Sequence, residues 1–199
     1  MNNLIPWSMM LLTSVASWAL PAIDIAVIDR TALEMSSDDL LQNKPIALDS
    51  SITQVPKDSE FSLTDATGPD TPALSNRWGG GTQEPVLRWD LGSLGQGGRT
   101  LTVIKVFIDS QSPSSSGAYF KFAAHFLGKG WQDITGYIAV DVPKTVFGTN
   151  MFKVVTITFP AGEVAGFDAL RLYDGKATHG YSTSTTFVEV DAFSTPGNR

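Results

Sequence analysis

The chain has 199 residues, of which 42% are hydrophobic and 17% are charged. This length suits one domain with a full core, and the 18 Gly and 11 Pro favour strands and turns over long helices. The net charge of −6 argues against nucleic acid as a partner, because phosphate binding needs clustered Lys and Arg. The absence of cysteine excludes disulfides and thiolate metal sites.

The N-terminal segment carries no charged side chain as far as residue 23 and has small residues around Ala19 and Ala22, which suit a signal-peptidase cut. We interpret residues 1–22 as a signal peptide. A retained membrane anchor is the alternative, because about 20 apolar residues can also span a bilayer; Pro6 and Pro21 near its ends favour cleavage. The sequence thus predicts a single domain over residues 23–199, secreted to the cell exterior or periplasm and not inserted in a membrane after cleavage.

The first half of the mature chain mixes one strand with long polar stretches. Residues 23–29 alternate as a strand does. Residues 36–42 begin with a serine cap and acidic residues, which indicates one short helical turn. Residues 49–81 are dense in Ser, Thr, Asp, Pro and Gly, a composition typical of loop, with one short strand expected at 60–63.

From residue 86 onward, short segments with a period of two recur between turn residues. In residues 86–91, Leu87, Trp89 and Leu91 fall on one face, which is the pattern of a half-buried strand. Further strands are predicted at residues 101–108, 119–127, 131–134, 153–159, 169–173 and 187–193. Regular short strands without a helical pattern between them indicate a sandwich or a barrel.

Three segments carry a resemblance to a known family. They are Asn76-Arg77-Trp78 followed by residues 87–92 (LRWDLG), residues 120–122 (FKF) followed by 128–134 (GKGWQDI), and residues 169–173 (ALRLY) followed by 187–193 (FVEVDAF). In this order they resemble the discoidin or coagulation-factor type C family and the related family-thirty-two carbohydrate-binding modules. The resemblance spans roughly residues 61–193 and implies an all-β, galactose-binding-like jelly-roll β-sandwich of two antiparallel sheets.

Two features depart from that family. The usual Asp-Gly before the Trp turn is here Gly128-Lys129-Gly130, and the two cysteines that tie the termini of animal members are absent. In addition, residues 137–150 are more than a tight connection needs.

The Asp-rich loop at residues 64–71 suggests a calcium site, because a hard cation binds several carboxylate and carbonyl oxygens. The resemblance implies such a structural site between this loop and the last strand. The candidate ligands are Asp65, Asp70, Thr71 and Glu189. A solvated acidic turn is the alternative interpretation.

The loop at residues 175–181 offers groups suited to sugar. Lys176, His179 and Tyr181 combine a cation, a histidine and an aromatic ring between two strands, and sugars need in-plane hydrogen-bonding groups below an apolar face. Tyr119 is a second candidate ring, and Arg77 with Trp78 is a third candidate position. An exposed polar loop is the alternative for residues 175–181.

The remaining tryptophans and the histidine on the predicted strand receive plainer interpretations. Trp89 is expected in the core, and Trp131 matches a family position that mostly serves packing, although either ring could stack on a sugar. His125 falls opposite the phenylalanines of its strand and is expected at the surface or rim.

No nucleophile elbow, phosphate-binding loop or zinc-protease motif occurs in the sequence. The sequence therefore predicts a secreted non-catalytic carbohydrate-binding module, with structural calcium as its cofactor and a glycan or polysaccharide as its partner. One alternative is a structural or cell-adhesion protein of a matrix or envelope that binds a protein partner. The other is a small polysaccharide-cleaving enzyme.

Overall fold

The computed structural model describes residues 19–30, 36, 39–48, 86–92, 99–109, 117–141, 152–175 and 187–196. Within these residues the chain forms ten strands and no helix. The strands are β1 (Asp24–Arg30), β2 (Ala47–Leu48), β3 (Val86–Asp90), β4 (Arg99–Asp109), β5 (Gly117–Phe126), β6 (Gly130–Asp133), β7 (Ile138–Asp141), β8 (Phe152–Thr158), β9 (Phe167–Asp174) and β10 (Phe187–Pro196).

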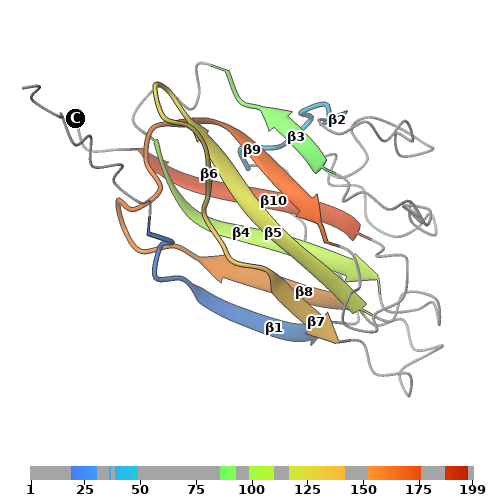
Figure 1. Ribbon diagram of the computed structural model, residues 1–199. Helices are drawn as coiled ribbons and strands as arrows, with labels where there is room; N and C mark the ends of the chain where they lie inside the picture. Colours follow the sequence, from blue (N-terminus) through green and yellow to red (C-terminus); the bar gives the residue numbers. More distant parts are fainter. Residues whose placement is uncertain are drawn as a thin grey trace, which may run out of the picture.

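The strands form two antiparallel sheets that face each other (Figure 1). Sheet A has the order β1-β8-β4-β10, and sheet B has the order β2-β3-β9-β5-β6, with β7 also paired to β5. Neither sheet closes into a barrel. This architecture confirms the predicted all-β sandwich of two antiparallel sheets.

The chain crosses repeatedly from one sheet to the other. β3, β5 and β9 belong to sheet B, whereas β4, β8 and β10 belong to sheet A. Apart from the consecutive pairs β2–β3 and β5–β6, the hydrogen-bonded neighbours therefore come from segments that are not consecutive in the sequence. The pairing of β9 with both β3 and β5 is the example that matters for function.

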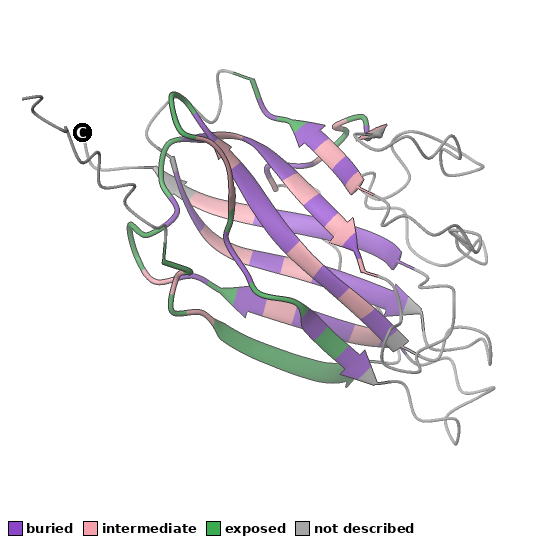
Figure 2. Ribbon diagram, in the orientation of Figure 1, coloured by how far each residue is buried: buried purple, intermediate pink, exposed green. Residues whose placement is uncertain are grey.

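The core lies between the sheets and contains the side chains that the period of two predicts. Leu87, Trp89 and Leu91 are at most 2% exposed. Phe120 and Phe122 are fully buried and meet edge to face, with ring centroids 5.9 Å apart. Buried and partly exposed residues alternate along the central strands (Figure 2). This is the pattern expected when one side of each strand faces the core and the other side faces away from it.

The predicted strands are confirmed with small shifts at their ends, and two more are present. β7 lies inside residues 137–150, a segment predicted to be a connection longer than a tight turn, and β2 is only two residues long. The predicted helical turn is a turn over residues 40–43, closed by the Lys44 amide donating to the Leu41 carbonyl at 2.8 Å. The strand expected at residues 60–63 lies outside the described residues.

The strand β1 follows the predicted signal-peptide cut and lies at an edge of sheet A, where β8 is its partner among the described strands. Residues 24–29 are all exposed, in contrast to the central strands (Figure 2). Residues 1–18 of the predicted signal peptide lie outside the described part of the chain. Across the residues described, none belongs to a helix of the length and apolarity needed to cross a membrane.

Candidate functional site

The outer face of sheet B carries a group of polar and aromatic side chains. Because β3, β5 and β9 bury alternate residues, the residues between them point to the outside of the sandwich. The antiparallel register aligns these outward residues in rows across the sheet, with Asp90 opposite Ala169, and Ala169 opposite His125. His125 in turn stands opposite Trp131 on β6. Four strands therefore contribute to one surface.

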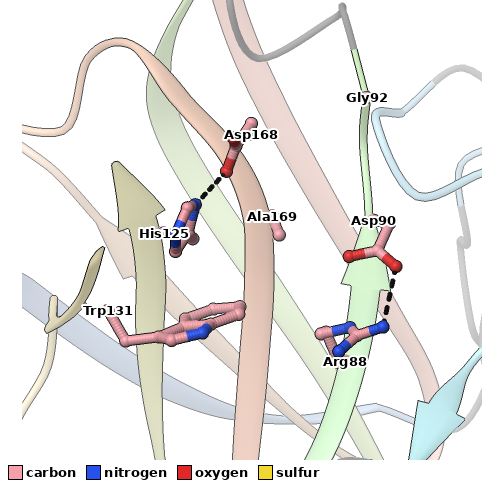
Figure 3. A pocket seen from close by; sticks show the side chains of 7 residues that line it. All are labelled: Arg88, Asp90, Gly92, His125, Trp131, Asp168 and Ala169. Carbon is pink, nitrogen blue, oxygen red and sulfur yellow. Dashed lines mark hydrogen bonds and ion pairs between the residues drawn. The ribbon is translucent and has the colours of Figure 1, made fainter. Parts of the chain in front are cut away.

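A shallow hollow of about 440 Å³ lies on this face. It is lined by Arg88, Asp90, Gly92, His125, Trp131, Asp168 and Ala169. Trp131 stands on one side of the hollow and the Arg88–Asp90 pair on the other, with β9 between them (Figure 3). The buried side chain of Ala169 leaves room at the centre.

Trp131 is held by cross-strand contacts and is only partly buried. The guanidinium carbon of Arg171 lies 3.7 Å from the centre of the Trp131 ring, which is a close cation–π contact. The His125 ring lies 5.3 Å from the indole at an interplanar angle of 60°. These contacts fix the indole on the outer face of sheet B. Trp131 was expected to serve packing, but it lies outside the core between the sheets.

His125 is oriented by Asp168, whose position depends on a break in the strand register. His125 Nδ1 and Asp168 Oδ1 are 2.6 Å apart. The pairing of β5 with β9 shifts between His125 and Phe126, so that Asp168 is the extra residue on β9. Such a bulge redirects a side chain, and the Asp168 carbonyl also accepts a hydrogen bond from the Leu91 amide at 2.9 Å.

Arg88 and Asp90 form the opposite wall of the hollow. Both are on β3, and because they are two residues apart their side chains share a face. Arg88 Nη2 donates to Asp90 Oδ2 at 3.0 Å, and the two side chains are 32% and 62% exposed. The chain leaves β3 at Gly92, whose φ of +58° suits glycine.

The hollow combines an aromatic wall with balanced charge. The guanidinium groups of Arg88 and Arg171 are matched in number by the carboxylates of Asp90 and Asp168, all within one small area. Such a surface offers hydrogen-bond donors and acceptors without a strong field of one sign. It therefore suits a polar, uncharged ligand that also presents an apolar face.

Of the six sugar-binding residues predicted from the sequence, the structure describes Tyr119. Tyr119 is on β5, and its ring stacks on that of Tyr137, with centroids 4.6 Å apart and an interplanar angle of 8°. Arg77, Trp78, Lys176, His179 and Tyr181 lie outside the described residues, so these assignments stay predictions.

Of the four predicted calcium ligands, the structure describes Glu189. Glu189 is fully buried on β10, whereas Asp65, Asp70 and Thr71 lie outside the described residues. Calcium takes six to eight oxygen ligands, and the described part of the chain contains no group of three or more His, Asp or Glu side chains that could hold a metal ion. The calcium site therefore stays a prediction.

A second buried carboxylate lies two residues beyond Glu189. Asp191 is fully buried, and its Oδ2 accepts a hydrogen bond from the Ser36 amide at 3.0 Å. Burial raises the pKa of Asp191 from 3.8 to about 6, and the negative charge of Asp39 adds to this rise, against the opposing effects of the Ser36 hydrogen bond and Lys105. No pattern in the sequence indicates this shift, because the contacts of Ser36 and Asp39 with Asp191 depend on the tertiary structure.

Most of the residues that line the hollow are not recognisable as site residues from the sequence. In the sequence Arg88 and Asp90 look like ordinary outward-facing strand residues, and Asp168 lies just before the strand predicted at residues 169–173. His125 was expected at the surface or rim and is found there, on the edge of a hollow. One feature of the sequence points to the hollow. The alternate strand residues predicted to face outward include charged and aromatic side chains, such as Arg88, Asp90 and His125.

Comparisons with known proteins found distant structural similarity alone. No protein-family model matches the chain, and no curated protein matches it. One similar solved structure is the C-terminal domain of a chitobiase from Bacteroides fragilis, with 13% identity and a TM-score of 0.48, covering 81% of this chain and 100% of that domain. Another is a glycoside hydrolase with 15% identity and a TM-score of 0.30. This second match covers 55% of the chain and 19% of the hydrolase, so the chain spans less than a fifth of that protein. Neither comparison assigns a ligand or an activity to this chain.

Proposed function

We propose that the protein is a non-catalytic carbohydrate-binding module that holds a neutral sugar in the hollow on sheet B. The observation that carries the proposal is the placement of Trp131. A partly exposed indole on the outer face of a sheet, with Arg171 over one side of its ring and a polar hollow beside it, offers the other side of the ring as an apolar platform for a sugar. This position differs from the loop site expected from the sequence.

The polar side chains around the platform supply the hydrogen bonds that sugar hydroxyls require. Asp90 and Asp168 accept, Arg88 donates, and His125 can do either according to its tautomer. Because Arg88 is braced by Asp90 and His125 by Asp168, these groups are held in place before a ligand arrives, which lowers the entropy lost on binding. Hydrogen bonds to charged groups are also the stronger ones.

Three further features belong to the same proposal. The domain is secreted, it does no chemistry on the sugar, and calcium at the loop of residues 64–71 supports neighbouring loops. The hollow is formed by strands, so we expect sugar binding there to persist when calcium is removed.

The proposal is tested on an array of glycans and polysaccharides with the purified protein, in calcium and again in EDTA. We expect the unaltered protein to bind a defined neutral sugar class and Trp131→Ala to lose this binding, with Trp131→Phe retaining part of it. Leu127→Ala serves as the matched control, because Leu127 is 72% exposed in the turn between β5 and β6 and does not line the hollow. Absence of binding by the folded protein across the array would overturn the proposal, and release of new reducing ends would identify an enzyme.

A second candidate function is adhesion to a protein partner, and the exposed edge strand β1 favours it. Ile25 and Val27 are each 44% exposed and Ile28 is 40% exposed, on a strand that pairs on one side within the part of the chain that the structure describes. Exposed apolar edge strands pair readily with another extended chain. Self-association that is abolished by Val27→Lys and unaffected by Trp131→Ala would support this function.

A further inference from the structure

Beyond the hollow, the outer face of sheet B carries a second group of aromatic side chains. Tyr119 is on β5 and Tyr173 is on β9, and Tyr137 directly precedes β7. Tyr137 is 40% exposed. The Tyr119 and Tyr137 rings are stacked, and Lys121 Nζ lies 4.7 Å from the centre of the Tyr173 ring and 5.2 Å from that of Tyr137.

This tyrosine group lies on the same strands and the same face as the hollow. Tyr119, Lys121, Ala123 and His125 are alternate residues of β5, so their side chains all point outward. His125 lines the hollow, and Tyr119 lies six residues away, a distance of about 20 Å along a strand. Both groups therefore belong to one strip along β5.

Small and paired side chains occupy the middle of the strip. Ala123 stands opposite Arg171 on β9 and opposite Asp133 on β6, and it is 1% exposed. Lys121 Nζ and Asp133 Oδ2 are 2.8 Å apart. The strip thus continues the pattern of the hollow, in which aromatic rings alternate with cations that are balanced by carboxylates.

A tight backbone contact holds the stacked tyrosine pair at the end of the strip. The Gly175 amide donates to the Tyr119 carbonyl at 2.6 Å. A Cβ atom at Gly175 would lie 2.6 Å from Tyr119 Cδ1 and 2.8 Å from Tyr137 Cε1, both far inside normal contact. The position of the two rings therefore requires glycine at residue 175.

We infer that the tyrosine group is a second sugar subsite and that the protein recognises a neutral, linear oligosaccharide lying along β5 from Trp131 toward Tyr137. This inference rests on the proposed sugar binding in the hollow. A chain of several sugar units presents repeated apolar faces and hydroxyl rims, which match the repeated rings and paired charges of the strip. A single sugar fills the hollow alone and leaves the tyrosines unused.

The test is calorimetric titration with oligosaccharides of one to six units, in β-1,4-linked glucose, N-acetylglucosamine, xylose and mannose series. We expect affinity in the recognised series to rise at least tenfold from the shortest binding ligand to the hexamer. Tyr137→Ala should remove most of that rise and leave the affinity for the shortest ligand within about twofold, whereas Trp131→Ala should weaken every length. Tyr137→Phe keeps the ring and should restore the rise with length.

A backbone variant tests the same subsite without deleting a ring. Gly175→Ala should lower affinity for the hexamer toward that of the short ligand, because the added methyl displaces the tyrosine pair. The matched control is Gly136→Ala, where the nearest atom to an added Cβ is 4.0 Å away. Circular dichroism and thermal unfolding verify that each variant is folded.

The outcomes separate this inference from the proposed function. Binding that depends on Trp131 but is equal for all lengths, or a rise with length that Tyr137→Ala leaves unchanged, would overturn the second subsite and leave the hollow as the whole site. No binding of any length in any series would overturn the second subsite together with the proposed function.

Discussion

The outer faces of the two sheets differ in the burial and the polarity of their side chains. On sheet A, Phe107, Phe152, Val154 and Val188 form an apolar cluster in which each residue is at most 6% exposed, and Glu189 and Asp191 on the same sheet are fully buried. On sheet B, the corresponding face presents partly exposed rings and ion pairs around a hollow. Both faces belong to one sandwich, yet among the described residues it is the face of sheet B that gathers partly exposed rings and ion pairs around a hollow. This contrast teaches that an outward strand position is not by itself a surface position.

The largest effect is expected from removing a ring on the outer face of sheet A. Phe107→Ala should lower the free energy of unfolding by about 3–5 kcal/mol, the usual cost of deleting a buried phenylalanine side chain, because Phe107 is 1% exposed. Urea denaturation measures this change. Tyr137→Ala, at a 40% exposed position on the other face, is the comparison and should cost much less. Equal losses for the two variants would contradict the contrast between the faces.

The next effect is a pH dependence that arises on sheet A. The pKa of Asp191 is raised from 3.8 to about 6 in the folded protein, so the stability that this group contributes is complete below about pH 4 and is lost as the pH rises through 6. Asp191→Asn should therefore be more stable than the unaltered protein at pH 8 by roughly 2–3 kcal/mol, with the difference shrinking toward pH 4.

Urea denaturation at pH 4, 6 and 8 measures that difference for each protein. The matched control is Asp133→Asn on the outer face of sheet B, where the carboxylate is 46% exposed and pairs with Lys121. A stability difference for Asp191→Asn that does not vary with pH would show that burial of this carboxylate has no effect on its titration.

A smaller change in free energy, but a decisive one for function, is expected at Trp131. Trp131→Ala should reduce affinity for the recognised sugar at least tenfold, which corresponds to about 1.4 kcal/mol, because it removes the apolar platform of the hollow. Its free energy of unfolding should fall far less than that of Trp89→Ala, since Trp89 is fully buried in the core. Titration calorimetry and urea denaturation on the same samples separate the two effects. A loss of stability as large as that of Trp89→Ala would make Trp131 a core residue.

The smallest effect on stability is expected from the Arg88–Asp90 pair. Arg88→Lys keeps the charge and loses the planar guanidinium, and the side chains are 32% and 62% exposed. Exposed ion pairs contribute about 0.2–1 kcal/mol, so the melting temperature should change little, while affinity for sugar should fall several-fold. Unchanged affinity in titration calorimetry would remove Arg88 from the binding site.

Much of the fold could be predicted from short patterns in the sequence. The alternation of Leu87, Trp89 and Leu91 identified both β3 and its buried face, because a period of two is a local property of an extended chain. β2 was missed because two residues cannot show a period. The four residues of β7 lie in a segment predicted to be a long connection, whereas the equally short β6 was located by the glycine turn before it. The turn residues, chiefly Gly128 and Gly130 with positive φ, marked the end of β5 for a similarly local reason.

The candidate site could be predicted only in part. Trp131 and Tyr119 were considered as possible platforms from their residue types, and His125 was correctly assigned to the outer side of its strand. Arg88, Asp90 and Asp168 could not be selected, because their significance depends on which strands are neighbours. The chain crosses to the other sheet between β3 and β4, between β4 and β5, and between β8 and β9, so β3, β5 and β9 become neighbours without being consecutive in the sequence.

The sequence by itself determined that this protein is built from short strands with one apolar side, because side-chain alternation and turn residues act over a few positions. The tertiary structure decided what the other side of those strands does. The pairing of β5 with β9 brings His125 within 2.6 Å of Asp168, 43 residues away, and the pairing of β9 with β3 adds Arg88 to the same hollow. The tertiary structure also keeps the hollow on the outer face of sheet B accessible, and it buries Asp191 on sheet A. These outcomes depend on contacts between distant segments, whose partners no local pattern specifies.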